Sequence, residues 1–397
     1  MLLSRIKGNI IKLVTKIFAN SNIIGSPAKV SDAYKWHVNN INESSWHEIS
    51  KEERIKEILP NFIEHAISDK HKKALERNTS STFVLKLKNA KVWGARGAVV
   101  TKDDTFLSDV SREFGKEPRE HSIFNTLKLK KPKYINGNVA VLSTAGSNVY
   151  YHWLFDVLPR IKLLQLSGLY KEIDYFILDY QELKFQKETL AILNISESKI
   201  LRSNNNWDFC VRAKSLYVPS LVNKINGINK LECEFLKENF LLNSSGDIKR
   251  NRKIYISREK AGNRHLVNED EIYAYLSEFG FEKVFTEDLS FIEQVNLFAQ
   301  STFIIAPHGS SLSNTVFCSS ETMVIDIMPE SNINICFWVL ANNLKINYWY
   351  IIGKPVAING NVQHDNIFLP IEKLKKIIQN SPLNERDENL HQDSYGY

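Results

Sequence analysis

Residues 306–314, with the sequence APHGSSLSN, carry the strongest chemical pattern in the chain. They follow an apolar stretch and precede helical periodicity, so we expect a strand, a tight turn and a helix start. Gly309 permits close approach of the backbone, Ser310 and Ser311 supply hydroxyls, and free N–H groups at a helix start bind anions. His308 could donate to a phosphate or orient a sugar. The alternative is an ordinary strand-to-helix turn with a capping serine.

Two arginines form a second candidate group. Arg258 follows the predicted strand 253–257, and Arg264 lies in the loop that contains Gly262. Two guanidinium groups at the carboxyl end of a strand suit bidentate capture of a diphosphate, whereas a lone arginine after a strand is usually a surface charge. Glu293, early in the predicted helix 290–300, is either a partner of the helix dipole or a ribose ligand.

The third candidate is a histidine–aspartate pair. His152 and Asp156 are four residues apart in the predicted helix 147–166, which places both on one helical face. A carboxylate in that position can orient an imidazole, so the pair suits general-base activation of a hydroxyl. A paired anchor between helix and sheet is the alternative. We expect Asn148, Tyr151 and Arg160 to lie on the same, acceptor, side.

The segments that would position these groups alternate between strand and helix patterns, as in β-α-β units with a parallel sheet. The expected strands are 138–143, 174–178, 198–201, 213–218, 253–257, 283–285, 302–306, 323–327 and 348–352. The expected helices, besides 147–166, are 186–193, 228–242, 268–279, 290–300, 311–318, 333–342 and 370–379. Short strands are expected within 82–107 and one helical stretch around 52–67.

A polar segment, 243–252, separates two such α/β halves, which predicts two Rossmann-like lobes with a cleft between them. The predicted domains are an amphipathic helix (1–25), a helical and β-strand region (26–135), an acceptor-side lobe (136–245), a donor-binding lobe (246–380) and a disordered tail (381–397).

The net charge of +6 is concentrated at the amino-terminal end. Residues 1–20 carry four basic side chains and no acid, interleaved with a stripe of leucine, isoleucine and valine. This pattern predicts an amphipathic helix that either lies on an anionic membrane or docks on its own protein. The rest of the chain is close to neutral, which argues against nucleic-acid binding. Four cysteines without a C-x-x-C pair indicate a reducing, cytoplasmic compartment, and the lack of a long apolar run predicts no spanning helix.

Several well-known motifs are missing from the sequence. It contains no G-x-G-x-x-G, no P-loop, no G-x-S-x-G, no H-E-x-x-H and no D-x-D. The sequence therefore gives no sign of dinucleotide binding or of P-loop nucleotide hydrolysis, and we predict neither a cofactor nor a metal site. A diphosphate site in one lobe and a His/Asp pair in the other would suit transfer of a group from an activated donor to an acceptor hydroxyl.

Three segments in order resemble glycosyltransferase family 61: YYHWLFDVLPR, IYISREKAGNRHLVNED and SFIEQVNLFAQSTFIIAPHGSSLSNTVF. The resemblance implies a GT-B fold, inverting transfer from a nucleotide sugar and usually no essential metal. It assigns Arg258, Arg264, the turn His308–Gly309–Ser310–Ser311 and Asn314 to the donor, and His152 and Asp156 to the H-x-x-x-D pair that would supply the base. Asp326 stands where a ribose-binding glutamate is common.

We therefore predict an inverting, metal-independent glycosyltransferase that moves a sugar from a nucleotide-sugar donor to a glycan or glycolipid hydroxyl. The acceptor class is a cell-surface glycan of the capsule, lipopolysaccharide or exopolysaccharide type, and the enzyme is expected in the cytoplasm, with peripheral contact with the inner membrane face through residues 1–20. Two alternatives stay open. One is a transferase for a CMP-sugar or phosphoribosyl donor, and the other is a non-catalytic nucleotide- or glycan-binding subunit of a membrane assembly.

Overall fold

The computed structural model describes residues 26–62, 67–126, 131–204, 206, 208–222, 227–241 and 249–381. The predicted amphipathic helix 1–25 lies outside the described residues, as does the predicted tail from residue 382 onward. The chain forms two compact units: unit 1 contains residues 1–53 and 79–224, and unit 2 contains residues 54–78 and 225–397. The boundary near residue 225 precedes the helix that we had assigned to the acceptor-side lobe.

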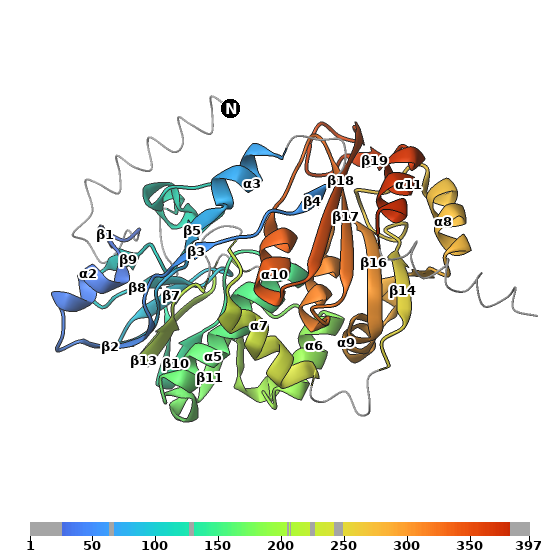
Figure 1. The fold of residues 1–397 in the computed structure, drawn as a ribbon. Helices are drawn as coiled ribbons and strands as arrows, with labels where there is room; N and C mark the ends of the chain where they lie inside the picture. Colours follow the sequence, from blue (N-terminus) through green and yellow to red (C-terminus); the bar gives the residue numbers. More distant parts are fainter. Residues whose placement is uncertain are drawn as a thin grey trace, which may run out of the picture. The chain divides into compact units, whose positions relative to one another are not determined.

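Unit 1 is built around one ten-stranded sheet (Figure 1). Its strands are β1 (Lys29–Ser31), β2 (Ser44–Ser50), β6 (Thr82–Lys88), β7 (Lys91–Trp93), β8 (Ala98–Val100), β9 (Thr105–Leu107), β10 (Lys133–Val141), β11 (Tyr175–Leu178), β12 (Ile200–Arg202) and β13 (Cys210–Pro219). Its α-helices are α2 (Ala33–Val38), α4 (Tyr150–His152), α5 (Pro159–Leu166) and α6 (Lys184–Ile192). A π-helical turn, Trp153–Val157, joins α4 to α5, and 3-10 turns occupy Pro118–Glu120, Ser122–Asn125, Tyr170–Glu172 and Glu197–Lys199.

The predicted region 26–135 is not a separate domain: its strands outside residues 54–78 belong to this sheet, and residues 54–78 belong to unit 2. Strands β13, β10, β11 and β12 pair in parallel as expected for β-α-β units. On its other side β13 pairs antiparallel with β6 and β7, which carry the sheet on to β2 and to β8, β9 and β1. One apolar core spans both parts, with Leu85, Val99, Val141 and Leu216 among its fully buried residues. Because these residues pack in one core, the strands before residue 135 and those after it form one unit, although the sequence predicted two.

Unit 2 contains a seven-stranded sheet. Its strands are β4 (Asn61–Phe62), β14 (Arg252–Ile256), β15 (Glu282–Val284), β16 (Ser301–Pro307), β17 (Met323–Pro329), β18 (Asn347–Val356) and β19 (Asn366–Phe368), and a separate hairpin pairs β3 (Arg54–Lys56) with β5 (Glu76–Asn78). Its α-helices are α3 (Asp69–Ala74), α7 (Lys230–Leu236), α8 (Glu269–Glu278), α9 (Phe291–Gln300), α10 (Cys336–Leu344) and α11 (Ile371–Gln379). A π-helical turn follows α7 at Lys237–Leu241, and 3-10 segments occupy Thr286–Asp288 and Ser310–Phe317.

The strand order of unit 2 predicts where a ligand binds. Its parallel strands pair in the order β15-β14-β16-β17-β18, so chain order reverses between β14 and β16; β14, β16, β17 and β18 lie side by side in Figure 1. In such doubly wound sheets ligands bind beyond the carboxyl ends of the two strands at this switch point. The chain leaves β14 at Ser257 and Arg258, and it leaves β16 at His308 and Gly309.

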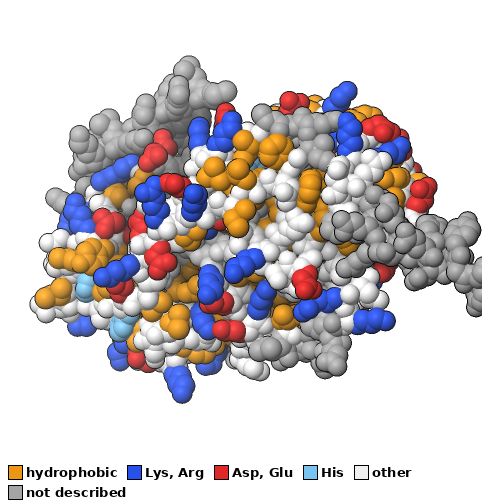
Figure 2. Space-filling model, in the orientation of Figure 1, with side chains coloured by type: hydrophobic (Ala, Val, Ile, Leu, Met, Phe, Trp, Pro, Cys, Tyr) orange, Lys and Arg blue, Asp and Glu red, His pale blue; other side chains and the backbone are white. Residues whose placement is uncertain are grey.

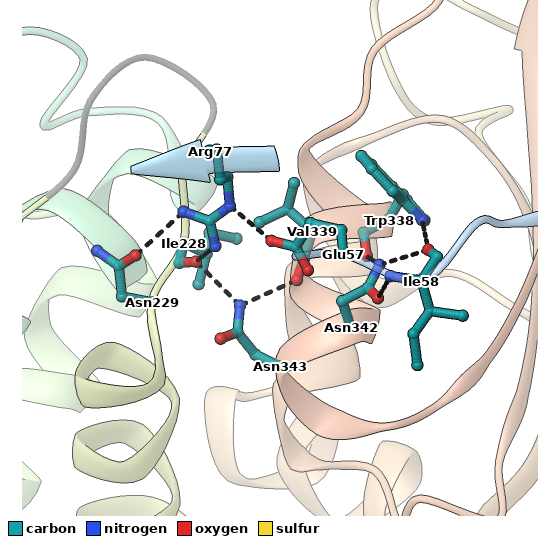
Figure 3. A network of polar contacts seen from close by, with 9 residues as sticks. All are labelled: Glu57, Ile58, Arg77, Ile228, Asn229, Trp338, Val339, Asn342 and Asn343. Carbon is teal, nitrogen blue, oxygen red and sulfur yellow. Dashed lines mark hydrogen bonds and ion pairs between the residues drawn. The ribbon is translucent and has the colours of Figure 1, made fainter. Parts of the chain in front are cut away.

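The predicted helix around 52–67 is wrong. Within that range the described residues form β3 and β4, and β4 pairs in parallel with β18 through Asn61 and Phe62. Figure 3 shows how this early segment is held in unit 2. Arg77 lies in an ion pair with Glu57 at 2.5 Å and donates to the Ile228 carbonyl and to the Asn229 side chain.

Neighbouring contacts hold the same segment from the side of α10. Ile58 donates its N–H to the side chain of Asn342 and accepts from the indole of Trp338. These partners lie more than 150 residues away in sequence, and long-range pairing overrides the weak local helical pattern.

Charge is spread over both units. Figure 2 shows, on one face, Lys and Arg side chains interspersed with Asp and Glu side chains over the described residues. None of the helices in the described part of the chain combines the length and the apolar character needed to cross a bilayer.

Candidate functional site

The histidine–aspartate pair of unit 1 lies on a π-helical turn. Nδ1 of His152 is 2.6 Å from Oδ2 of Asp156, and each side chain is about one-quarter exposed. The turn is closed by a bond from the Leu158 N–H to the Trp153 carbonyl, five residues back. Pro159, which follows, has no N–H to donate and begins α5 as its first residue. The predicted single helix 147–166 is therefore three shorter pieces, and π-turns of this kind occur frequently at functional sites.

The imidazole of His152 is enclosed on two sides. Gly146 has a φ of +80°, and a Cβ atom there would lie 2.6 Å from Cδ2 of His152, so only glycine fits. The ring of Phe114 packs against the imidazole with a centroid distance of 4.9 Å. Because the carboxylate of Asp156 accepts at Nδ1, Nδ1 carries a proton, and Nε2 has no hydrogen-bond partner among the described residues. Nε2 is thus the nitrogen available to a substrate.

The three predicted acceptor-side residues have different environments. Asn148 is exposed in the turn that precedes α4, and Tyr151 is half-buried with its ring 5.1 Å from that of His152. Arg160 is completely buried and donates to the carbonyls of Ser143 and Pro219. Burial lowers the pKa of Arg160 to about 9, although Asp156 opposes that shift. Arg160 therefore anchors the helix to the sheet, and of the three residues only Asn148 and Tyr151 have accessible surface.

The switch point of unit 2 brings Arg258 against Gly309. A Cβ atom at Gly309 would lie 1.9 Å from Nη1 of Arg258, so the guanidinium rests directly on the glycine backbone. Nε and Nη2 of Arg258 donate to the Asn263 carbonyl at 3.1 and 3.0 Å, and Nη2 also donates to the side-chain oxygen of Asn263 at 3.0 Å. Nη1 has no partner among the described residues. The segment after β14 and the turn after β16 therefore meet within unit 2.

The electrostatics of the two arginines fit an anion site. Burial, together with the neighbouring Arg264, lowers the pKa of Arg258 to about 10, although Glu287 opposes this shift. Burial also lowers the pKa of Arg264, whose Nε is buried without a hydrogen-bond partner in the described part of the chain. Arg264 adopts a left-handed φ of +57°, which is uncommon for a residue other than glycine. Two half-desolvated cations that repel each other are stabilised when an anion binds between them.

His308 is held by a buried carboxylate. Its Nδ1 is 2.9 Å from Oδ2 of Asp326, and the Tyr348 hydroxyl donates to the same oxygen at 2.8 Å. His308 is 3% exposed and Asp326 is fully buried, so Asp326 orients the imidazole and is not accessible to a ribose. The replacement of the common glutamate by Asp326 already put a ribose contact at this position in doubt, and the burial of Asp326 agrees with that. Burial together with Asp326 raises the pKa of Tyr348, which keeps that hydroxyl protonated as a donor.

The segment after Gly309 differs from its predicted form. Ser310–Phe317 is a 3-10 helix, and its first position is capped by Gly309 without a side-chain hydrogen bond, so the expected serine cap is wrong. Ser310 and Ser311 are half-buried, and Oγ of Ser311 has no partner in the described part of the chain, so it can turn to a ligand. Asn314 is fully buried, and its side chain donates to Gln294 and to the Ser311 carbonyl. Asn314 fixes the turn from behind.

Glu293 is accounted for by helix capping. It accepts from the N–H and hydroxyl of Ser290 at 2.7 and 2.6 Å, and the Ser290 hydroxyl accepts from the Glu293 N–H. This reciprocal pair is a capping box at the start of α9. The sequence offered Glu293 either as a partner of the helix start or as a ribose ligand, and the structure shows it at the helix start.

Several residues that complete the site were missed by sequence reasoning. Asn263 positions Arg258, Tyr348 positions Asp326, and Phe114 and Gly146 enclose His152. Asn263 could have been found from its place between the two arginines, whereas the others come from distant segments and carry no local signal. Among the described residues, no group of three His, Cys, Asp or Glu side chains is arranged to hold a metal ion.

Comparison with known proteins supports the order of the motifs. The family described as Glycosyltransferase 61 matches residues 150–325, which include His152, Arg258 and the Gly309 turn. A 128-residue stretch is 27% identical to Beta-1,2-xylosyltransferase XAX1 of Oryza sativa subsp. japonica. That stretch covers 30% of this chain and 22% of the length of the rice protein. The resemblance predicted from the three sequence segments is confirmed.

Proposed function

We propose that this chain, whose residues 150–325 carry the glycosyltransferase 61 pattern, transfers a sugar from a nucleoside diphosphate sugar to a hydroxyl of a glycan. The observation that carries the proposal is the placement of Arg258 on Gly309 at the switch point of unit 2. The free Nη1 of Arg258, the orphaned Nε of Arg264 and the hydroxyl of Ser311 offer three donors to one anion. A diphosphate supplies enough oxygens to use all of them.

Unit 2 would stabilise the leaving group. As the bond between the anomeric carbon and the diphosphate breaks, negative charge builds on the diphosphate oxygens, and the two guanidinium groups are already in place to stabilise it. His308 can add a hydrogen bond from Nε2 when its ring carries both protons, because Nδ1 is committed to Asp326. These residues supply positive charge of their own at the leaving group, which supports the metal-independent form of the proposal.

Unit 1 would activate the acceptor. Nε2 of His152 takes the proton of the acceptor hydroxyl, and Asp156 holds the imidazole in the tautomer that leaves Nε2 free and stabilises the imidazolium that forms. The acceptor oxygen then attacks the anomeric carbon from the face opposite the leaving diphosphate, so the transfer inverts configuration. Of the two candidate bases, the geometry favours His152, with Asp156 as its orienting partner.

The finer assignments rest on the family resemblance and, for the location, on the cysteines and the basic amphipathic pattern of residues 1–20. They are a GT-B arrangement, an acceptor among cell-surface glycans of the capsule, lipopolysaccharide or exopolysaccharide type, and a cytoplasmic location with peripheral membrane contact through residues 1–20. The name of the rice relative makes a pentose donor such as UDP-xylose the first to test, alongside hexose donors.

A thermal-shift panel tests the donor class. The full chain is melted with UDP, GDP, dTDP, ADP, CMP or phosphoribosyl pyrophosphate, each with and without EDTA. A ligand at 100 times its dissociation constant adds about 2.7 kcal/mol of stability, which is readily measured. We expect one nucleoside diphosphate to stabilise the wild type in EDTA and to lose that effect in Arg258→Ala. Stabilisation by CMP or phosphoribosyl pyrophosphate alone would change the donor class, and wild-type turnover in Arg258→Ala would overturn the proposal.

A further inference from the structure

The loop of residues 108–117 in unit 1, whose sequence is mostly polar, lies next to the His152–Asp156 pair. Its central residue, Glu113, has a fully buried side chain. The Glu113 carboxylate accepts from the Lys116 ammonium at 2.6 Å and from the N–H and hydroxyl of Ser122 at 3.1 and 2.5 Å, and it lies 3.1 Å from Nη1 of Arg96. Four contacts from one buried carboxylate fix the conformation of this loop.

The electrostatics show that Glu113 is charged in the folded protein. Burial by itself would raise the pKa of Glu113, but the hydrogen bonds from Lys116 and Ser122 and the nearby His121 outweigh burial and lower the pKa to about 2. The loop is therefore pinned by an ionised carboxylate throughout the physiological range.

The two neighbours of Glu113 are engaged with the catalytic pair. Arg112 interacts electrostatically with Asp156, and the ring of Phe114 packs against the imidazole of His152. Glu113, between them, is directed into the interior instead. The loop thus holds the Arg112 guanidinium and the Phe114 ring in fixed places beside the His152–Asp156 pair.

Phe114 is partly exposed next to the imidazole of His152. Half of its surface is accessible although it is a large apolar side chain, and one side of its ring is occupied by His152. Exposed aromatic surface beside polar groups is characteristic of binding sites. The adjacent Gly115 has a φ of +68° with open space around it, so no side chain covers the ring from that position.

We propose that Phe114 is a stacking platform for the acceptor sugar, and that the loop pinned by Glu113 holds this platform beside His152. This inference rests on the proposed function, which supplies an acceptor glycan. A pyranose ring has one face of C–H groups and a rim of hydroxyls. The C–H face can lie against an aromatic ring while the rim stays free for polar partners. A sugar stacked on the open surface of Phe114 is therefore bound next to the His152–Asp156 pair.

Ligand-observed saturation-transfer NMR tests the platform without requiring turnover. The full chain is mixed with methyl β-xylopyranoside, methyl α-mannopyranoside, methyl α-glucopyranoside or methyl β-galactopyranoside. For at least one pyranoside we expect strong saturation of the C–H protons on one ring face. Phe114→Ala and Phe114→Leu should weaken that binding by about five- to tenfold, whereas Phe114→Trp should retain it. Tyr134→Ala removes a comparably exposed aromatic ring of unit 1 and should have no effect.

The possible outcomes separate this inference from the proposed function. Wild-type pyranoside binding in Phe114→Ala, or no pyranoside binding by the wild type, would overturn the platform even if a nucleoside diphosphate binds unit 2. Pyranoside binding that depends on Phe114, without donor binding or transfer, would keep the platform and overturn the proposed function. Preserved thermal stabilisation of Phe114→Ala by the nucleoside diphosphate shows that the variant is folded.

Discussion

Gly309→Ala tests the central geometric claim. The added methyl carbon would lie 1.9 Å from Nη1 and 2.9 Å from Cζ of Arg258, so the guanidinium must retreat by about 1.5 Å to reach ordinary contact at 3.4 Å. The substitution causes no backbone strain, because the φ of Gly309 is −171°, an extended conformation that alanine adopts freely. The cost therefore falls on Arg258 and on its hydrogen bonds to Asn263.

The expected magnitude follows from that displacement. A charged hydrogen bond contributes about 1.5–3 kcal/mol, so the dissociation constant of the nucleoside diphosphate should rise by about 10- to 100-fold. Misplacement of a positioning group by about 1 Å can lower kcat/KM by about 100-fold. The free energy of unfolding should change little, because a guanidinium at the end of a flexible side chain can move aside.

Isothermal titration calorimetry and urea unfolding measure the two quantities on the same samples. Gly262→Ala is the matched control, because that glycine lies in the same loop as Arg264 with no atom within 4 Å of the added carbon. The double variant Gly309→Ala/Arg258→Ala should bind no more weakly than Arg258→Ala alone, since the clash is gone once the guanidinium is removed. Wild-type affinity in Gly309→Ala, or additive losses in the double variant, would refute the reasoning.

Three further perturbations probe other parts of the molecule. Asp156→Asn should lower kcat by about 1,000-fold with unchanged donor affinity, because an amide no longer selects the His152 tautomer with a free Nε2; steady-state rates and calorimetry check this. The pKa of Glu113 is lowered from 4.5 to about 2, so its stabilisation is complete above pH 4.5 and is lost as the pH falls toward 2. Glu113→Gln should therefore cost about 2–3 kcal/mol at pH 7 and flatten the acid side of the stability profile in urea titrations. Arg77→Met leaves Glu57 buried and uncompensated and should destabilise by about 3–5 kcal/mol in the same assay, whereas adding Glu57→Leu should restore most of that loss.

The parallel strands of unit 2 after residue 249 follow closely from the sequence because their apolar pattern matches their burial. Strands β14, β16 and β17 lie within one or two residues of the segments expected from the pattern. Strands β16 and β17 are almost entirely buried and β14 is buried at its last three residues, so each contains an apolar run that is readily identified.

The segment 54–78 could not be placed from sequence. β4 is only two residues long, and it forms because Asn61 and Phe62 find the edge of β18 nearly 290 residues later. The buried ion pair of Arg77 with Glu57 is equally invisible, because charged residues spaced by 20 positions read as surface. Local propensity carries no information about such partners.

The same limit applies inside the candidate site. The spacing of His152 and Asp156 correctly placed the two side chains together, since residues four apart share a helical face. It did not reveal the π-turn, which depends on Pro159 and on the packing of the buried residues of Trp153–Val157. Nor did it reveal Phe114, which reaches the histidine from a loop 38 positions earlier.

The two arginine-side motifs show why topology succeeded where local pattern did not. Arg258 and Gly309 are far apart in sequence, and neither segment alone is more than a turn after a strand. Once strands β14 and β16 are neighbours at the reversal of chain order, both turns must emerge at one point of the sheet edge. A side chain larger than hydrogen at position 309 would then displace the guanidinium, which is itself held by Asn263. The close contact at Gly309 thus depends on a partner that only the fold supplies, and this dependence makes its substitution a test of the proposed donor site.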